Sequence, residues 1–184
     1  MEEKLLIAKV LLFNDERAFA QIVNRYQQPL RSFFLTQTGD PALSDDLAQE
    51  TFVRVWERLK SFRQLSSFST WLYRIAYNLW YDEVRRSRPV LSLDGPDGPP
   101  PEAELVLQTD RQQDVSRQTI VRWVRRSLAL MDEPERTCLT LFYLQEQPTK
   151  AIARIMDMPE GTVRSHLSRG RNRLKAILEK NEPK

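Results

Sequence analysis

Apolar residues recur at helical spacing along most of the chain, and the clearest case lies between Ser69 and Arg86. There the apolar positions fall three or four residues apart, which predicts one helix with a buried stripe, N-capped by Ser69 or Thr70. The buried stripe consists of Leu72, Ile75, Ala76 and Leu79. A second, polar and aromatic stripe faces outward on the same helix: Arg74, Asn78, Tyr81 and Arg85, with Tyr73 and Tyr77 beside it.

Three further helices are predicted ahead of this one. The first spans 2–12 with Leu5, Ala8 and Leu12 inward, and Asn14 suits its left-handed C-cap. The second begins after Asp15 and continues past Pro29. A turn at Gly39, Asp40 and Pro41 leads to the third helix, which we expect Ser44 to cap. Its predicted inward positions are Leu47, Thr51, Val55 and Leu59, and its predicted outward positions are Asp46, Gln49, Glu50 and Arg54.

The middle of the chain interrupts the helical pattern. Five prolines and two glycines fall between Pro89 and Pro101, a composition that builds no core element. We therefore predict an all-α protein of two small domains, 1–88 and 117–184, joined by an extended acidic linker over 89–116. Within the linker, 102–107 suits a short helical turn.

The periodic pattern returns after Arg117 and ends in the layout of a helix-turn-helix. Ile120, Val121, Val124 and Leu128 predict one buried face, and Leu139, Phe142 and Tyr143 predict another after Pro134. A helix from Pro148 to Met156, a turn over 157–159 and a helix from Glu160 complete the motif. Val163, Leu167, Gly170, Leu174 and Ile177 are the predicted buried positions of the last helix. Gly161, Arg164, Ser165, Ser168 and Arg169 then face outward near its N-terminal end.

The distribution of charge says more than its total, which is only +3 from 28 basic and 25 acidic residues. Seven basic residues stand against two acidic ones over 149–178, a balance of +5, whereas 88–117 holds three against six, a balance of −3. A basic C-terminal end indicates a polyanionic partner. If the partner is DNA, the outward residues near the N-terminal end of the last helix are the candidates for contacts with base edges. The candidates for contacts with phosphates are His166, Arg171, Arg173 and Lys175.

Little in the sequence suggests catalysis or metal binding. The single cysteine, Cys138, and the single histidine, His166, offer neither a disulfide nor a zinc ligand set. We expect no cofactor and no metal, and we interpret Cys138 as a small buried apolar residue. The apolar start is interrupted by Lys9 and lacks a cleavage site, and no apolar run reaches the roughly 20 residues of a membrane span. These features favour a cytoplasmic protein without membrane insertion.

The ring-rich helix has two interpretations when taken alone. Guanidinium, amide and phenol groups beside aromatic rings suit a surface that holds phosphates and stacks unpaired bases. A core helix with amphipathic aromatic residues at its rim would show a similar composition. The basic helix-turn-helix at the other end favours nucleic-acid binding.

Four segments, in this order and spacing, resemble the extracytoplasmic-function (ECF) sigma factors of bacteria, and sigma-E-like members among them, over essentially the whole chain. They are AFAQIVNRYQ from Ala18, DDLAQETFVRVW from Asp45, FSTWLYRIAYN from Phe68 followed by DEVRR, and GTVRSHLSRGRNRL from Gly161.

The resemblance implies roles for particular residues. It implies that Asp46, Gln49, Glu50 and Arg54 dock on the clamp helices of the largest subunit of core RNA polymerase, and that the flap of the second-largest subunit is a further contact. The −10 promoter element, with a base flipped out of the non-template strand, would meet Phe62, Arg63, Ser66, Ser67, Phe68, Arg74, Tyr77, Asn78, Tyr81 and Arg85. The −35 element would meet Arg164, Ser165, His166, Ser168, Arg169, Arg171 and Arg173. By the same likeness the linker acids Asp94, Asp97, Glu102 and Glu104 would lie near the RNA exit path.

The leading hypothesis is therefore a non-enzymatic promoter-specificity subunit, whose partners are core polymerase, promoter DNA and an anti-sigma factor. A helix-turn-helix regulator that binds duplex DNA on its own is the alternative, and it predicts tight binding without polymerase. An enzyme has the least support, because the chain lacks a Gly-rich phosphate loop and a clustered acid-base set.

Overall fold

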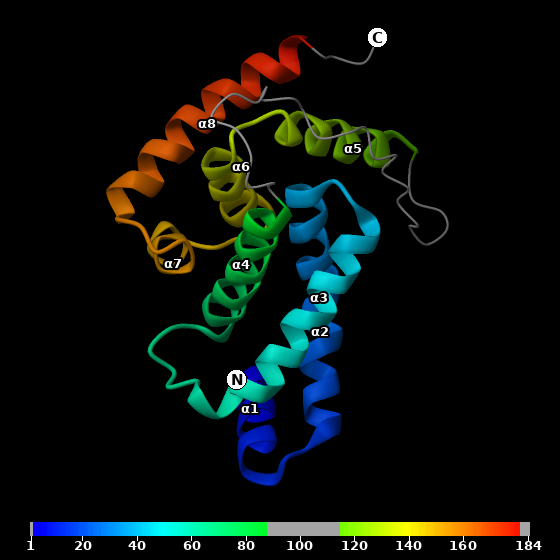
Figure 1. The fold of residues 1–184 in the computed structure, drawn as a ribbon, viewed down its shortest axis with the longest axis vertical. Coiled ribbons are helices and arrows are strands. Elements are labelled where there is room, and N and C mark those ends of the chain that lie inside the picture. The colour runs from blue at the N-terminus through cyan, green and yellow to red at the C-terminus, as the bar shows by residue number, and fades with distance from the viewer. Residues whose placement is uncertain (1, 88–114, 181–184) are drawn as a thin grey trace.

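The computed structural model describes residues 2–87 and 115–180 and shows two packed groups of helices (Figure 1). The first group comprises α1 (Glu2–Phe13), α2 (Glu16–Thr38), α3 (Pro41–Arg58), the short 3₁₀ turn η1 (Leu59–Ser61) and α4 (Phe68–Ser87). The second comprises α5 (Val115–Ala129), α6 (Glu133–Leu139), the π-helical turn η2 (Thr140–Leu144), α7 (Thr149–Ile155) and α8 (Glu160–Lys180). The all-α prediction is confirmed for the described residues. The linker acids and the helical turn predicted over 102–107 lie outside them.

Side-chain caps set the starts of the N-terminal helices. Asp15 accepts hydrogen bonds from the amides of Arg17 and Ala18 and opens α2, as predicted. Gly39, at φ 71°, closes the helix in the left-handed conformation that glycine adopts without steric cost.

Two predicted caps are wrong. Asp40, not Ser44, caps α3, accepting from the amides of Ala42 and Leu43 at 2.8 and 3.1 Å, with Pro41 in the first position. Ser44 is buried one turn inside the helix. Ser67, rather than Ser69 or Thr70, caps α4, because its Oγ accepts from the Thr70 amide at 3.1 Å. In both cases the helix begins earlier than the apolar pattern indicates.

The predicted inward face of α1 is also wrong. Leu6, Ile7 and Val10 are buried, whereas Leu5 and Leu12 are 58% and 74% exposed. The helix is apolar nearly all round, so spacing alone does not choose a face. Packing against α2 makes the choice, supported by the hydrogen bond from the Tyr26 hydroxyl to the Glu3 carboxylate.

The core of the first domain follows the predicted stripes of α3 and α4. Leu47, Thr51, Val55 and Leu59 are buried, and so are all four residues of the predicted α4 stripe. Tyr73 and Trp80, at 2% and 1% exposure, extend the buried face of α4. The fully buried Phe33 and Phe34 of α2 complete this core.

The second domain keeps the predicted helix-turn-helix. Asp157 adopts φ 52° in the turn between α7 and α8, a conformation that Asp tolerates better than most residues. Val163, Leu167 and Gly170 of α8 are buried, and Leu174 and Ile177 are half-buried. On α5 the prediction is wrong for Ile120 and Val121, which are 54% and 39% exposed, while Leu128 is buried.

The two domains pack directly against each other. Helix α7 lies against α4, and α2 contacts α5, α6 and η2 (Figure 1). Within the described residues, every helix is too short or too polar to cross a bilayer.

Candidate nucleic-acid and polymerase interfaces

The outward stripe of α4 is accessible as predicted. Arg74, Asn78 and Arg85 are exposed, and Tyr81 is 40% exposed. The ring of Tyr77 stacks on that of Tyr81, with centroids 6.0 Å apart and planes 28° apart. The helix thus presents a stacked aromatic pair between cationic groups, which suits contact with bases and phosphates together.

Phe62 and Phe68, both predicted to contact the −10 element, are buried at 9% and 2% exposure. Their rings contact each other and Trp71, and Phe68 also contacts Tyr26. Neither ring is exposed for stacking on a base in this structure. Instead the two rings hold the ends of the loop that carries Arg63, Ser66 and Ser67.

The tip of this loop holds a residue that sequence reasoning missed. Gln64 adopts φ 55°, and the next residue, Leu65, is 81% exposed. Arg63 is exposed as well, Ser66 is half-buried, and Ser67 caps α4. An apolar residue inside a polar loop was the available sequence signal for Leu65.

The first turns of α8 present a polar surface. Arg164, Ser165, Ser168 and Arg169 are exposed, as predicted. Arg164 pairs with Glu160 at 2.7 Å, and this hydrogen bond is the main cause of a lowered pKa for the Glu160 carboxyl. The Arg169 guanidinium lies 3.2 Å from Nδ1 of the half-buried His166.

The other two predicted arginines of α8 contact groups of their own domain, and so does Arg169, whose Nε lies 3.5 Å from Glu135 Oε1. Arg173 pairs with Asp132, and its Nη1 lies 3.7 Å from Glu135 Oε2. Nine residues separate Arg173 from Arg164, which is two and a half helical turns and places the two side chains on opposite sides of α8. Arg171 is exposed and donates to the Tyr143 hydroxyl at 3.5 Å.

The predicted polymerase face of α3 is solvent-accessible. Asp46, Gln49 and Glu50 are exposed, and Arg54 Nε pairs with Glu50 Oε1 at 2.9 Å. The sequence analysis overlooked Val53, which is 51% exposed and lies one turn beyond Gln49 and Glu50. A single exposed apolar residue is ordinary on a protein surface, so the position of Val53 among the predicted docking residues is what makes it a contact candidate.

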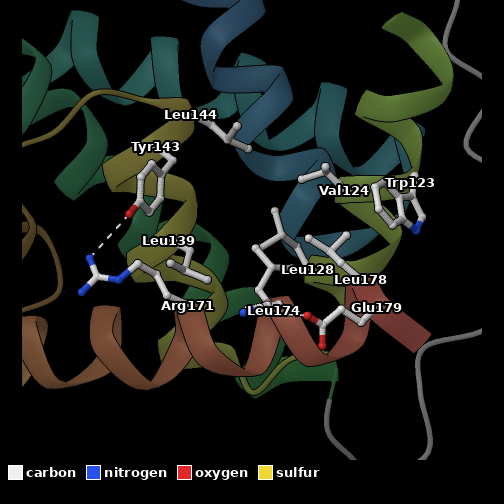
Figure 2. Close-up of a pocket in the computed structure, with 11 residues that line it drawn as sticks. Trp123, Val124, Leu128, Leu139, Tyr143, Leu144, Arg171, Leu174, Leu178 and Glu179 are labelled. Carbon is white, nitrogen blue, oxygen red and sulfur yellow. Dashed lines mark hydrogen bonds and ion pairs between the residues drawn. The ribbon is translucent and has the colours of Figure 1, made fainter. Parts of the chain in front are cut away.

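An apolar groove of about 480 Å³ lies on the second domain between α5, η2 and α8 (Figure 2). Leu128, Leu139 and Leu174 line it, and Tyr143 and Leu144 lie along one side (Figure 2). Arg171, Lys175 and Glu179 also line the groove. The side chains come from four separate elements, α5, α6, η2 and α8, so periodicity within one helix does not reveal the groove.

The described residues contain no group of three or more His, Cys, Asp or Glu side chains placed to hold a metal ion. Cys138 is fully buried, 3.6 Å from the Met156 sulfur, and burial raises the pKa of its thiol to about 12. A protonated, buried thiol is chemically inert, which agrees with the packing role predicted for this residue.

Two family models match the chain in the two helical domains. The model described as sigma-70 region 2 covers residues 22–90, and the model described as sigma-70, region 4 covers residues 121–174. The fold and the two exposed basic surfaces thus define a sigma factor of the sigma-70 class.

Two relatives identify the family within this class, and two solved structures share the fold. The chain is 31% identical over 169 residues to the ECF RNA polymerase sigma factor SigW of Bacillus subtilis, covering 89% of this chain and 90% of the relative. It is 32% identical to the ECF RNA polymerase sigma-E factor of Salmonella typhimurium, covering 100% of this chain and 96% of the relative. The fold matches CnrH, solved in complex with the cytosolic domain of CnrY, with a TM-score of 0.73 at 22% identity over 99% of this chain and 100% of that one. It also matches the sigma factor RpoE of Bartonella quintana, solved with the anti-sigma factor NepR, with a TM-score of 0.65 at 23% identity over 89% of this chain and 98% of that one. The chain belongs to the ECF family of RNA polymerase sigma factors.

Proposed function

We propose that this chain binds core RNA polymerase, directs it to specific promoters and helps to open the −10 region. The observation that carries the proposal is the pairing of two exposed surfaces in the two matched regions: the aromatic and cationic face of α4 and the polar N-terminal half of α8. The first suits unpaired bases and the second suits the major groove of duplex DNA.

The energetics of base capture are compatible with this role. Extracting a base from the duplex costs a few kcal/mol, and stacking on an aromatic ring contributes about 1 to 3 kcal/mol per base. The Tyr77–Tyr81 pair supplies accessible rings, whereas Phe62 and Phe68 support the loop from beneath. DNA opening by this route needs no ATP and no enzymatic activity of the chain itself.

The deciding experiment combines the purified chain with core polymerase and a genomic promoter library. Specific transcripts with a shared pair of upstream motifs support the proposal, and permanganate-reactive thymines near the start site support opening. If transcription from every promoter is no greater than that of core polymerase alone, the proposed function is wrong. Tight DNA binding by the chain alone, unchanged by polymerase, would instead favour a stand-alone regulator.

The α3 face, with Val53 next to Arg54 at its C-terminal end, is the proposed contact for the clamp helices. Val53→Lys places a charge where an apolar contact would form, and we expect at least about tenfold weaker binding to core polymerase. Leu12→Lys is the matched control, because Leu12 is also exposed but lies on α1. Equal loss of binding in both variants would refute this assignment.

The groove of Figure 2 is the proposed site for the flap of the second-largest subunit, an apolar segment being the occupant that its leucines suit. Tyr143→Asp should weaken this contact, whereas Leu130→Asp, at an equally exposed position outside the groove, should not. A pull-down with the isolated flap fragment reports the difference. We also expect an anti-sigma factor to bind this chain, and co-purification from the host before and after stress tests that expectation.

A further inference from the structure

Glu135, in the first turn of α6, carries a buried carboxylate that faces α8. The residue is 9% exposed, and its Cβ lies 3.4 Å from the position that a Cβ on Gly170 would occupy. Helices α6 and α8 therefore approach closely at this point, and the Glu135 side chain lies between them. Acidic side chains are rarely buried without a partner, so the groups beside this carboxylate indicate its role.

Two arginines lie beside this carboxylate, and both belong to α8, one turn apart. Arg169 Nε lies 3.5 Å from Glu135 Oε1, and Arg173 Nη1 lies 3.7 Å from Glu135 Oε2. Oε2 is buried and has no hydrogen-bond partner among the described residues, so these ion pairs are what holds the carboxylate. An apolar side chain of this size would fill the same space without burying a charge, so packing alone gives no reason for an acid here.

Arg169 and Arg173 use different ends of the guanidinium. Arg173 approaches Asp132 and Glu135 with its terminal Nη1. Arg169 approaches Glu135 with Nε, next to the aliphatic stem, and its Nη2 lies 3.2 Å from His166 Nδ1. The Arg169 side chain is 64% exposed, so Nη1 and the second hydrogen of Nη2 stay available to a ligand. Two contacts thus fix the plane of the Arg169 guanidinium and leave its outer edge free.

We propose that Glu135 is a positioning residue for promoter recognition, which orients the Arg169 guanidinium toward the base edges of the −35 element without contacting DNA itself. This inference rests on the proposed function and on the predicted role of Arg169 as a base reader. A guanidinium that is already ordered loses less conformational entropy on binding than a mobile one. The gain applies only where Arg169 makes its contact, so Glu135 raises the preference for one base pair more than the overall affinity for DNA.

The test variant is Glu135→Leu, which removes the carboxylate and keeps an apolar side chain of similar size. The arginines left behind, Arg169 and Arg173, are 64% and 47% exposed and reach water, so this variant should fold with a Tm close to that of the wild-type chain. The control is Asp132→Ala, which removes an acid that pairs with Arg173 and leaves the pair between Arg169 and Glu135. Asp132 makes no side-chain hydrogen bond to the start of α6, so this control does not remove a helix cap.

The first measurement needs neither DNA nor polymerase. The NMR order parameter of the Arg169 Nε–Hε group in the full-length chain reports whether the guanidinium is ordered on the picosecond-to-nanosecond timescale. It should fall in Glu135→Leu and keep the wild-type value in Asp132→Ala. An order parameter that is equally low in the wild-type chain and in Glu135→Leu would overturn the proposal.

The second measurement is base preference, by competition between a −35 duplex selected by the chain with core polymerase and copies with single base-pair changes. Ordering one long side chain accounts for roughly a 2- to 12-fold difference, so Glu135→Leu should reduce the preference at one base pair by that factor. Asp132→Ala should keep the wild-type preference at every position. Glu135→Gln keeps the shape and one acceptor oxygen, so it should recover part of the preference.

A double-mutant cycle separates positioning from a general structural effect. In an Arg169→Ala chain, where this preference is already lost, Glu135→Leu should cause no further change. An equal loss with and without Arg169, or a loss at every base pair, would refute the positioning role. If Glu135→Leu does not fold, Glu135→Gln takes its place in the cycle, and its smaller loss must likewise disappear in the Arg169→Ala chain.

Failure of the proposed function is distinguishable, because then no chain, wild-type included, binds core polymerase. The competition is then run on duplexes selected by the full-length chain alone, and the same cycle decides whether Glu135 sets a base preference through Arg169. A preference that is independent of Glu135 in both competitions would contradict the proposal.

Discussion

Arg164 and Arg173 lie on the same helix, yet the structure predicts opposite outcomes for their replacement by alanine. Arg164 is 69% exposed as a side chain and near the N-terminal end of α8, where a recognition helix meets base edges. Arg173 lies half a turn around the helix and pairs with Asp132 and Glu135 of the same domain. Both were predicted DNA contacts, and only Arg164 faces away from its own domain.

The magnitudes follow from these environments. A good arginine contact to a base pair contributes about 1–3 kcal/mol of discrimination, so Arg164→Ala should reduce preference for the correct −35 base roughly 5- to 150-fold. Its pair with Glu160 is exposed to solvent and screened, so Tm should stay close to that of the wild-type chain. Arg173→Ala removes half-exposed pairs worth about 0.2–1 kcal/mol, which lowers Tm by up to roughly 3 °C.

The assay is initiation by the reconstituted polymerase on a mapped promoter and on copies with single −35 base-pair changes. With Arg164→Ala, initiation should no longer depend on the base identity at one position of the −35 element. With Arg173→Ala, initiation should depend on the base at every position as it does with the wild-type chain. Thermal unfolding of each chain is recorded in parallel. If Arg173→Ala relaxes base preference as strongly as Arg164→Ala with an unchanged Tm, the orientation of α8 inferred from its ion pairs is refuted.

Three further predictions concern packing, capping and pH. Gly170→Val should destabilise the chain by about 1–3 kcal/mol, because even a Cβ at this position meets Leu139 Cδ1 at 3.2 Å. Gly161→Ala is the control: no atom lies within 4 Å of its Cβ, so it should raise or preserve Tm. Asp40→Ala should cost about 1 kcal/mol in urea unfolding, since two amides of α3 lose their acceptor, and no change would contradict the cap. Cys138 should react with a thiol reagent about a thousandfold more slowly in the native than in the unfolded chain at pH 8, and equal rates would contradict its burial. Because the folded thiol has a pKa of about 12 against an ordinary value of 9.0, the folded state holds the proton more tightly, so the contribution of this group to stability is complete below pH 9 and is lost as the pH rises towards 12.

Sequence reasoning succeeded where one face of a helix was clearly more apolar than the other. The α4 stripe from Leu72 to Leu79 and the α8 stripe from Val163 to Gly170 are buried as predicted. It failed on α1, whose apolar residues surround the helix, and at Ile120 and Val121, whose spacing fits a buried face that the fold leaves exposed. Periodicity identifies a face only when the residues around the helix differ in polarity.

The candidate site also contains residues that the sequence predicted correctly and residues whose environment it could not predict. The outward residues Arg74, Asn78, Arg164 and Ser168 follow from helical spacing and are exposed in the structure. Phe62 and Phe68 could not be separated from surface rings by sequence, because aromatic side chains serve both cores and base stacking. Their burial depends on Tyr26, which approaches Phe68 only when α2 and α4 pack together, and on Trp71 of α4, which Phe62 meets only when the loop folds against that helix.

Local patterning by itself determined the helices, the break between two domains, the recognition helix and the family likeness, because each depends on residues close together in the chain. The packing of regions 2 and 4, the groove between α5 and α8 and the engagement of Arg173 were decided only by the tertiary structure. Those features join side chains that are distant in sequence, such as Tyr73 with Gln145 and Gln37 with Arg136, and no local pattern specifies which distant partners meet.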